Sequence, residues 1–238
     1  MILQVPSFAS PVGEPTRLRV PPGLLSLERL NSRDQHRIDR FLDKSEELLA
    51  PAVAALSGPV ALRLDVGIPP NGSLLQQSSL DICAFSLADR LKRVVGREFA
   101  SVWCTKRHAD FSTVTVGPAV PVLAPAFGQT TTLVTRRSYS KVQFKEDIRD
   151  AVAGLTPVPD GPVSLQIAYV TGLPRTWANL WRPTISALGG LLGCRNALEP
   201  WDTDDERIVQ LALHHRSVGP SLGHSVQITI TAGQCPKA

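Results

Sequence analysis

A pair of adjacent carboxylates is the strongest chemical feature of the sequence. Asp204 and Asp205 come directly before RIVQLALHH, a segment that alternates apolar and polar residues as a strand does. Upstream, Asn179, Arg182 and Ser186 are spaced three and four apart and therefore share one face of a helix. Carboxylates at the start of a strand, beside a polar helix face, supply the oxygen ligands that a hard divalent cation needs. The pattern predicts a metal site, with a solvated acidic turn as the structural alternative.

The helix that carries this polar face is expected to start near Pro183 and to run to about Leu192. A proline further inside a helix loses a backbone hydrogen bond and clashes with the preceding turn, which confines the start. The apolar stripe of the helix consists of Leu180, Thr184, Leu188 and Leu191. His214 and His215 alternate along the following strand, so they face opposite ways and are not expected to share a metal ion.

The remaining elements follow the order of an α+β protein. We expect amphipathic helices at 33–56, 79–96 and 142–155, and strands at 60–66, 99–105, 112–116 and 130–140. Prolines at five positions within residues 1–23 disfavour a helix and predict a loosely held N-terminal arm, with a strand at 16–20. The Pro- and Gly-containing run 117–129 is interpreted as a linker.

Two stretches repeat the same order of elements. GPVALRLDVGIPP, which starts at Gly58, matches GPVSLQIAYVTGLPR, which starts at Gly161, and each follows a predicted helix. Continuing the match places residues 81–96 on residues 178–193, and Trp103 on Trp201. This recurrence predicts an internal duplication, in which two copies form one fused pair.

The second copy resembles the RusA-type Holliday-junction resolvases, which are crossover junction endodeoxyribonucleases. The family motif reads approximately D-x-D-N-x-x-K-(P)-x-x-D-A-L, followed by D-D-x-x-[IV]. Asn179 matches the motif Asn, Arg182 the Lys and Pro183 the Pro, while Asp204 and Asp205 match the acidic pair. Members of this family are small homodimers that bind four-way DNA junctions and cut them with Mg²⁺.

The resemblance covers about residues 130–233, and the first copy more faintly. It implies an α+β fold of two tandem RusA-like repeats, each with a helix, a strand, a helix and a β-hairpin, that form an intramolecular pseudo-dimer. The expected boundaries are an arm at 1–23, repeat 1 at 24–118 and repeat 2 at 119–238. The chain is expected to be a monomeric pseudo-dimer or a weak homo-oligomer.

Both copies depart from the family motif where the family carries carboxylates. In the second copy, the family's aspartate positions hold Thr176, Ala178 and Ser186. In the first copy, Asp81 and Asp89 match two of those positions. Neither copy therefore holds a complete set of metal ligands.

Complementation between the copies is the remaining route to a metal site. Asp81 or Asp89 of the first copy must then approach Asp204 and Asp205 of the second, because two carboxylates alone hold Mg²⁺ poorly. The resemblance gives Arg182 and Asn179 roles in catalysis, and it implies Mg²⁺ or Mn²⁺ as the cofactor of an active enzyme.

Clusters of Lys and Arg are candidates for contacts with DNA phosphates. The formal net charge of +4 is compatible with a polyanionic partner. The candidate residues are Arg136, Arg137, Lys141, Arg175, Arg90, Lys92, Arg93 and Arg97. The last four of these lie near the C-terminus of a predicted helix, where cations also favour the helix dipole, so they have a structural explanation that requires no DNA.

The four cysteines form no CxxC pair, which favours reduced thiols. The N-terminal residues lack the basic and apolar regions of a signal peptide, and no later run has the length of a membrane span. We therefore expect a cytoplasmic protein with no membrane partner.

The leading hypothesis is a RusA-like protein that binds branched or duplex DNA, in which catalysis is weakened or lost. One alternative is an active Mg²⁺-dependent structure-selective endodeoxyribonuclease. The other is a catalytically inert scaffold whose degenerate sites bind protein. The three differ in whether DNA is bound and whether it is cut.

Overall fold

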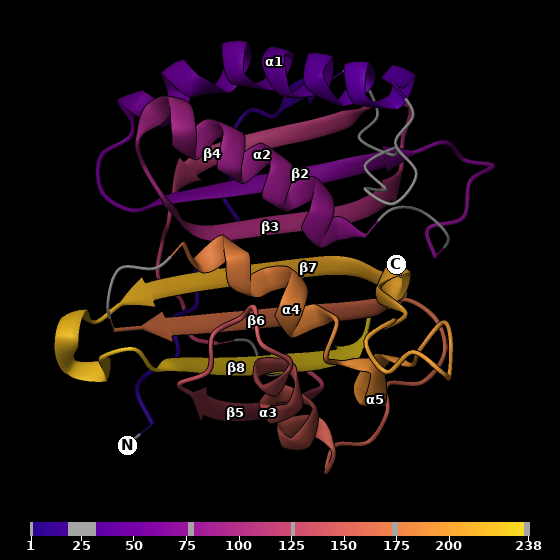
Figure 1. Ribbon diagram of the computed structural model, residues 1–238. Coiled ribbons are helices and arrows are strands. Elements are labelled where there is room, and N and C mark those ends of the chain that lie inside the picture. Colours follow the sequence, from indigo (N-terminus) through magenta and orange to yellow (C-terminus); the bar gives the residue numbers. More distant parts are fainter. Residues whose placement is uncertain (1, 19–31, 76–78, 125–126, 173–175, 236–238) are drawn as a thin grey trace.

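The protein is an α+β molecule built on one mixed sheet of eight strands (Figure 1). The computed structural model describes residues 2–18, 32–75, 79–124, 127–172 and 176–235. The strands are β1 (Thr16–Leu18), β2 (Val60–Ile68), β3 (Phe99–His108), β4 (Ser112–Pro118), β5 (Gln129–Thr135), β6 (Val163–Thr171), β7 (Ile208–Ser217) and β8 (Val226–Gln234). The α-helices are α1 (Ser32–Ala55), α2 (Leu80–Val95), α3 (Val142–Val152), α4 (Trp181–Ile185) and α5 (Gly189–Leu192), with 3₁₀ turns η2 (Trp177–Leu180), η3 (Asp205–Arg207) and η4 (Gly219–Leu222).

The strand order is symmetric about the middle of the sheet. It reads β1-β4-β2-β3 and then β7-β6-β8-β5, so each strand of the first half has a counterpart at the mirrored place in the second. β2 and β3 are parallel, as are β6 and β7, whereas β3 and β7 meet antiparallel. We call the β3–β7 ladder, with the elements at its two ends, the seam.

The register of the seam has the same symmetry. Ser101 pairs with His214, Trp103 with Ala212 and Thr105 with Gln210. Trp103 and Ala212 are each the fifth residue of a ten-residue strand, so the ladder is centred on this pair. The predicted match of Trp103 to Trp201 is therefore wrong, because Trp201 lies before η3 in a segment that is longer than the three residues between α2 and β3.

The helices pack on one face of the sheet and bury its apolar side. Figure 1 shows α2 lying across the first half and α4 across the second, with α1 near one edge and α3 and α5 near the other. Alternate strand residues such as Leu62, Val102, Leu213 and Ile167 are fully buried beneath them. Period-two alternation in the sequence therefore fixed which side of each strand carries the core.

Most predicted elements are present, with one break. α2 ends at Gly96, whose φ of 70° is left-handed, and α1 continues through Pro51. The predicted single helix up to Leu192 is wrong, because the segment divides into η2, α4 and α5. Pro183 has no N–H to donate, and Gly189 and Gly190 favour helix weakly, which together account for the division.

The other face of the sheet is crossed by the N-terminal arm. Gln227 of β8 accepts from the Leu3 N–H at 2.7 Å and donates to the Leu3 carbonyl at 2.8 Å. Arg216 donates to the Gln4 carbonyl, and the Phe8 ring lies 5.9 Å from the His214 ring. The expectation of a loosely held arm is wrong over the part the structure describes, since side chains of the sheet pin its backbone. Residues 19–23 of the predicted arm lie outside the described residues.

The linker expected at 117–129 begins inside β4 and includes the first residue of β5. Backbone bonds join Ala9 to Val120 and Val122 to Ser7, so the arm and this connection form a short antiparallel contact. Within the described ranges, no helix combines the length and apolar character required to cross a bilayer.

Candidate functional site

Two carboxylates from different halves of the protein meet at one end of the seam. Asp81 lies in the first turn of α2, and Asp205 opens η3 directly before β7. Both side chains are buried, with exposed fractions of 3% and 1%. The seam places them together because the end of β3, beside α2, runs antiparallel to the start of β7. Asp81 of the first half therefore approaches Asp205 of the second half, and we call these two residues the carboxylate pair.

Arg182 of α4 lies between the two carboxylates. Its Nη1 donates to Asp205 Oδ2 and lies 3.6 Å from Asp81 Oδ1. Asp81 Oδ1 has no hydrogen-bond partner although it is buried. The Arg182 side chain is 43% exposed, so the guanidinium group closes the carboxylate pair off from the surface. One cation therefore serves two buried anions.

Two further cations surround the pair. Arg195 Nη1 lies 3.3 Å from Asp205 Oδ1, and its Nη2 donates to Asp202 at 2.6 Å. Lys106 of β3 donates from Nζ to the Glu206 carbonyl at 2.7 Å, at the same end of the seam. Neither Lys106 nor Arg195 was among the predicted site residues. Arg195 belongs to no periodic pattern, and only its place beside Asp205 in three dimensions reveals it.

The electrostatics follow from burial. Burial raises the pKa of Asp81 to about 6, Arg182 lowers it in part, and the charge of Asp205 raises it further. Burial alone would lower the pKa of Arg182, but Asp81 and Asp205 hold it above its ordinary value. Burial lowers the pKa of Lys106, against the opposing influence of Glu206. Ionisation of Asp81 is thus opposed both by its burial and by the charge of Asp205.

The other predicted site residues occupy separate places. Asp204 precedes η3, its N–H bonds the Gly193 carbonyl, and burial raises the pKa of its carboxyl. Asn179 donates to the Tyr139 hydroxyl at 3.3 Å. Asp89 pairs with Arg93 at 2.8 Å and does not approach the carboxylate pair closely enough to form a cluster with it. Arg175 lies outside the described residues.

The donor set does not fit a divalent cation. Mg²⁺ takes six oxygen ligands in near-octahedral geometry and is usually held by carboxylates together with waters. Within the described ranges no three His, Cys, Asp or Glu side chains form a group with metal-ligand geometry. The two carboxylates that do meet are already neutralised by Arg182 and Arg195. The Arg182 guanidinium group thus occupies the position between Asp81 and Asp205 that a metal ion would need.

Further basic side chains lie on the second half of the protein, in the loop before α3 and on α3. Arg136, Arg137 and Lys141 lie in the exposed loop between β5 and α3. Lys145 and Arg149 follow on α3, with their charged groups 5.4 and 5.3 Å from the centre of the Trp201 ring. We call Arg136, Arg137, Lys141, Lys145, Arg149 and Arg182 the cationic surface.

Contacts join the region of Arg182 to the exposed loop and to α3. Tyr139, in the exposed loop, accepts from Asn179, which lies three residues before Arg182. Burial lowers the pKa of Lys145, and so does the neighbouring charge of Arg182. Loop, α3 and α4 therefore present their cations to one region.

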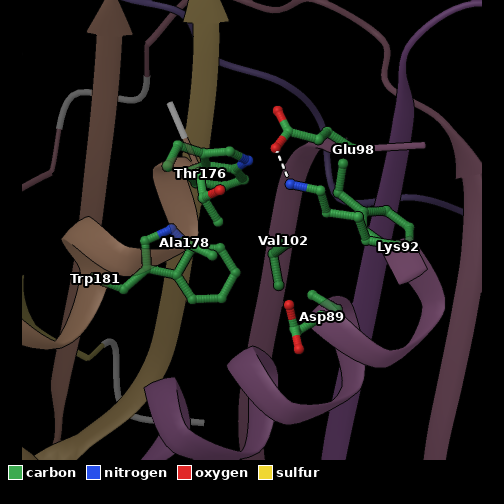
Figure 2. Close-up of a pocket in the computed structure, with 10 residues that line it drawn as sticks. Asp89, Lys92, Glu98, Val102, Thr176, Ala178 and Trp181 are labelled. Carbon is green, nitrogen blue, oxygen red and sulfur yellow. Dashed lines mark hydrogen bonds and ion pairs between the residues drawn. The ribbon is translucent and has the colours of Figure 1, made fainter. Parts of the chain in front are cut away.

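The opposite end of the seam holds a cleft instead of a carboxylate pair. Asp89, Lys92 and Glu98 come from the first half, and Thr176, Trp177 and Trp181 from the second. Figure 2 shows Lys92 bonded to Glu98 on one side, facing Thr176 and Ala178. Although the strand order is symmetric, the two ends of the seam thus carry different chemistry.

No protein-family model matches the chain, and no curated protein does. A solved structure of cyanuric acid hydrolase, described as "evolutionary innovation by structural concatenation", is similar with 13% sequence identity and a TM-score of 0.20. The match covers 78% of this chain and 62% of that one, so the chain spans less than two thirds of that structure. A likeness at this level carries no argument about fold or activity.

Proposed function

We propose that the protein binds branched or duplex DNA through the cationic surface and does not cleave it. On this proposal the two halves are degenerate RusA-like repeats, joined as an intramolecular pseudo-dimer. The symmetric strand order and the meeting of Asp81 with Asp205 across the seam both support a fused pair. The observation that carries the proposal is the position of Arg182 between those two carboxylates.

The position of Arg182 favours binding of DNA and disfavours its cleavage. Metal-dependent hydrolysis requires an ion that activates water and offsets charge on the leaving oxygen. Here the carboxylates are used to hold a guanidinium group, whose positive charge attracts phosphate but activates no water. The exposed part of Arg182 and the neighbouring basic side chains give affinity for a phosphate backbone without a step of bond cleavage.

A fluorescence anisotropy titration with a labelled four-way junction and a linear duplex tests the proposal. We expect binding at 50 mM salt with EDTA, no gain in affinity when Mg²⁺ replaces EDTA, since Mg²⁺ competes for the phosphates, and intact strands on a denaturing gel. Arg137→Gln should weaken binding because it removes an exposed charge from the cationic surface. The control Lys44→Gln removes an equal charge from α1, where Lys44 pairs with Glu47, and should leave affinity unchanged.

Failure to bind either DNA at 50 mM salt would reject the proposal and leave the protein-binding scaffold. Nicks that require Mg²⁺ or Mn²⁺ and vanish in Asp205→Asn would reject the loss of catalysis. That second function, a metal-dependent endonuclease, has one specific observation in its favour, namely that Asp81 and Asp205 do come together from opposite halves. A metal-dependent endonuclease requires Arg182 to move away from Asp81 and Asp205.

A further inference from the structure

The symmetric strand order gives the protein two equivalent halves, each of which is a place where a nucleic-acid segment can be held. A two-fold binder of a four-way junction presents equivalent cations in both halves, so that two arms are held alike. The basic clusters of the two halves, Arg90 to Arg97 and Arg136 to Lys145, differ in what neutralises them. Arg17 and Arg107 of the first half lie outside its cluster, where Arg17 packs on the Phe111 ring and Arg107 donates to Thr113. This difference, which bears on the proposed function, decides the class of DNA that the surface fits.

The basic cluster of the first half is engaged within the protein. Arg90 donates to Glu46 at 2.5 Å and to Asp43 at 2.7 Å, and Arg93 pairs with Asp89 at 2.8 Å. The hydrogen bond that Arg90 donates to Glu46 raises the pKa of Arg90. These side chains hold α2 against α1 and secure the last turn of α2, and their charges are already balanced.

Lys92 and Arg97 are also occupied. Lys92 pairs with Glu98 at the mouth of the cleft. Arg97 donates to the Val53, Leu56 and Gly58 carbonyls, and so caps the C-terminal end of α1. A cation that satisfies a helix terminus contributes to the fold, and a phosphate must compete with those carbonyls to reach it.

The second half presents cations without this neutralisation. In the described part of the chain, Arg136, Arg137, Lys141 and Lys145 form no ion pair with a carboxylate. Lys141, Lys145 and Arg149 recur every four residues, which sets them along one flank of α3. Asp147 lies on the other flank, where it accepts from Thr135. Lys141 and Lys145 therefore set a row of positive charge about 6 Å long, from the rise of about 1.5 Å per residue. Arg149 extends the row, although its Nε lies 3.6 Å from Asp150 Oδ1.

The aromatic groups indicate a duplex and not a single strand. Binding of single strands relies on aromatic rings that stand free for bases to stack on. The Trp201 ring is occupied by the charged groups of Lys145 and Arg149. Trp177 and Trp181 are buried, at 3% and 1% exposure, whereas Tyr139, in the loop between β5 and α3, is 40% exposed and offers one ring but not a run of rings. The surface is therefore suited to a phosphate backbone more than to exposed bases.

The far end of the seam disfavours a second segment. Its cleft presents the carboxylates of Asp89 and Glu98 beside Lys92 (Figure 2). Phosphates approaching this end meet two anions, each already bound to a neighbouring cation. The two ends of the seam thus differ in charge where a symmetric junction requires them to be alike.

We infer that the protein holds one DNA duplex on its second half and does not grip a four-way junction with two-fold symmetry. The inference rests on the proposed function and narrows it to a single duplex segment. The four unneutralised cations predict a slope of log K against log salt of about −3.6, from about −0.9 per phosphate contact. Between 50 and 200 mM salt this slope amounts to a loss of affinity of about 150-fold.

The test compares a linear duplex with a four-way junction whose arms have the same sequence and length, both titrated from 50 to 200 mM salt. We expect the same slope for both DNAs, and a junction affinity that exceeds the duplex affinity by no more than the roughly fourfold statistical advantage of four arms. Lys141→Gln should reduce the slope to about −2.7. Arg93→Gln, which removes an equal charge from the first half, should leave the slope at its original value.

Three results overturn the inference. One is a junction affinity tenfold or more above that of the duplex, with a slope about twice as steep. Another is a fall in slope of about 0.9 in Arg93→Gln, which would place that residue on a phosphate. The third is tighter binding of the single strand than of the duplex. Absence of binding to every DNA at 50 mM salt rejects the proposed function itself, which distinguishes the two failures.

Discussion

Asp81 should make the stability of the protein fall as the pH rises, and Asp81→Asn should remove that dependence. The folded protein holds the Asp81 carboxyl at a pKa of about 6, chiefly because the group is buried, against an ordinary value of 3.8. Between these values folding takes up a proton. The stability contributed by the protonated form is therefore fully present below pH 3.8 and is lost as the pH rises through 6.

The size of the effect follows from those two pKa values. Full ionisation of Asp81 costs about 3 kcal/mol at neutral pH, from about 1.36 kcal/mol for each pKa unit. Integrated between pH 4 and pH 8, the unfolding free energy of the wild type should fall by about 2 kcal/mol relative to that of Asp81→Asn. An asparagine does not titrate, so the variant gains on the wild type over this range whatever constant difference separates the two proteins.

Urea unfolding followed by tryptophan fluorescence at pH 4, 5, 6, 7 and 8 measures this difference. Other titrating groups cancel when the two proteins are compared at each pH. Ser79→Ala is the matched control, because it alters the residue before the same helix and neither side chain titrates between pH 4 and pH 8. Its difference from wild type should not vary with pH. If the difference in unfolding free energy between Asp81→Asn and wild type changes by less than about 0.5 kcal/mol across the range, instead of by about 2 kcal/mol, the buried charge is refuted.

Two further perturbations test the architecture. Arg207 donates to the Gly161, Leu192, Val158 and Pro159 carbonyls. Arg207→Lys should lower the unfolding free energy by about 3 kcal/mol, because an ammonium group cannot span these acceptors. Calorimetry that shows no change in Tm would contradict this role. Gln227→Ala removes both hydrogen bonds to Leu3 and should lower the unfolding free energy by about 1–2 kcal/mol. Proteolysis of the N-terminal arm should also become faster. An unchanged cleavage rate would show that the arm is held without Gln227.

The order of elements was predictable because it depends on local patterns. Alternation identified the strands β2, β6 and β7, and Gly96 identified the end of α2, where a left-handed residue is needed. The duplication was predicted from the order of these patterns, and the symmetric sheet agrees with it. The match of Trp103 to Trp201 failed because identity between two residues says nothing about the loop lengths between them.

The chemistry of the site depended on contacts that no local pattern encodes. The prediction that the first half supplies a carboxylate singled out Asp81 and Asp89, but nothing in the sequence indicated that Arg182 would lie between Asp81 and Asp205. Arg195 reaches Asp205 through a turn without periodicity. The engagement of the Arg90 to Arg97 cluster by α1 follows from the packing of two helices. Charge in the sequence thus indicated candidates, and only their partners in three dimensions separate binding groups from structural ones.

The seam also determines the order of folding, because the β3–β7 ladder joins the two halves. Each half contains its own parallel strand pair and its own helices, formed from segments near one another in the chain. The ladder that joins them brings together residues such as Ser101 and His214, which lie 113 positions apart. Because such distant pairing is slow, the halves should form first and the β3–β7 ladder last. Until then each half exposes an unpaired central strand, so at high protein concentration β3 of one chain should pair with β7 of another, and refolding should yield exchanged dimers whose proportion rises with concentration.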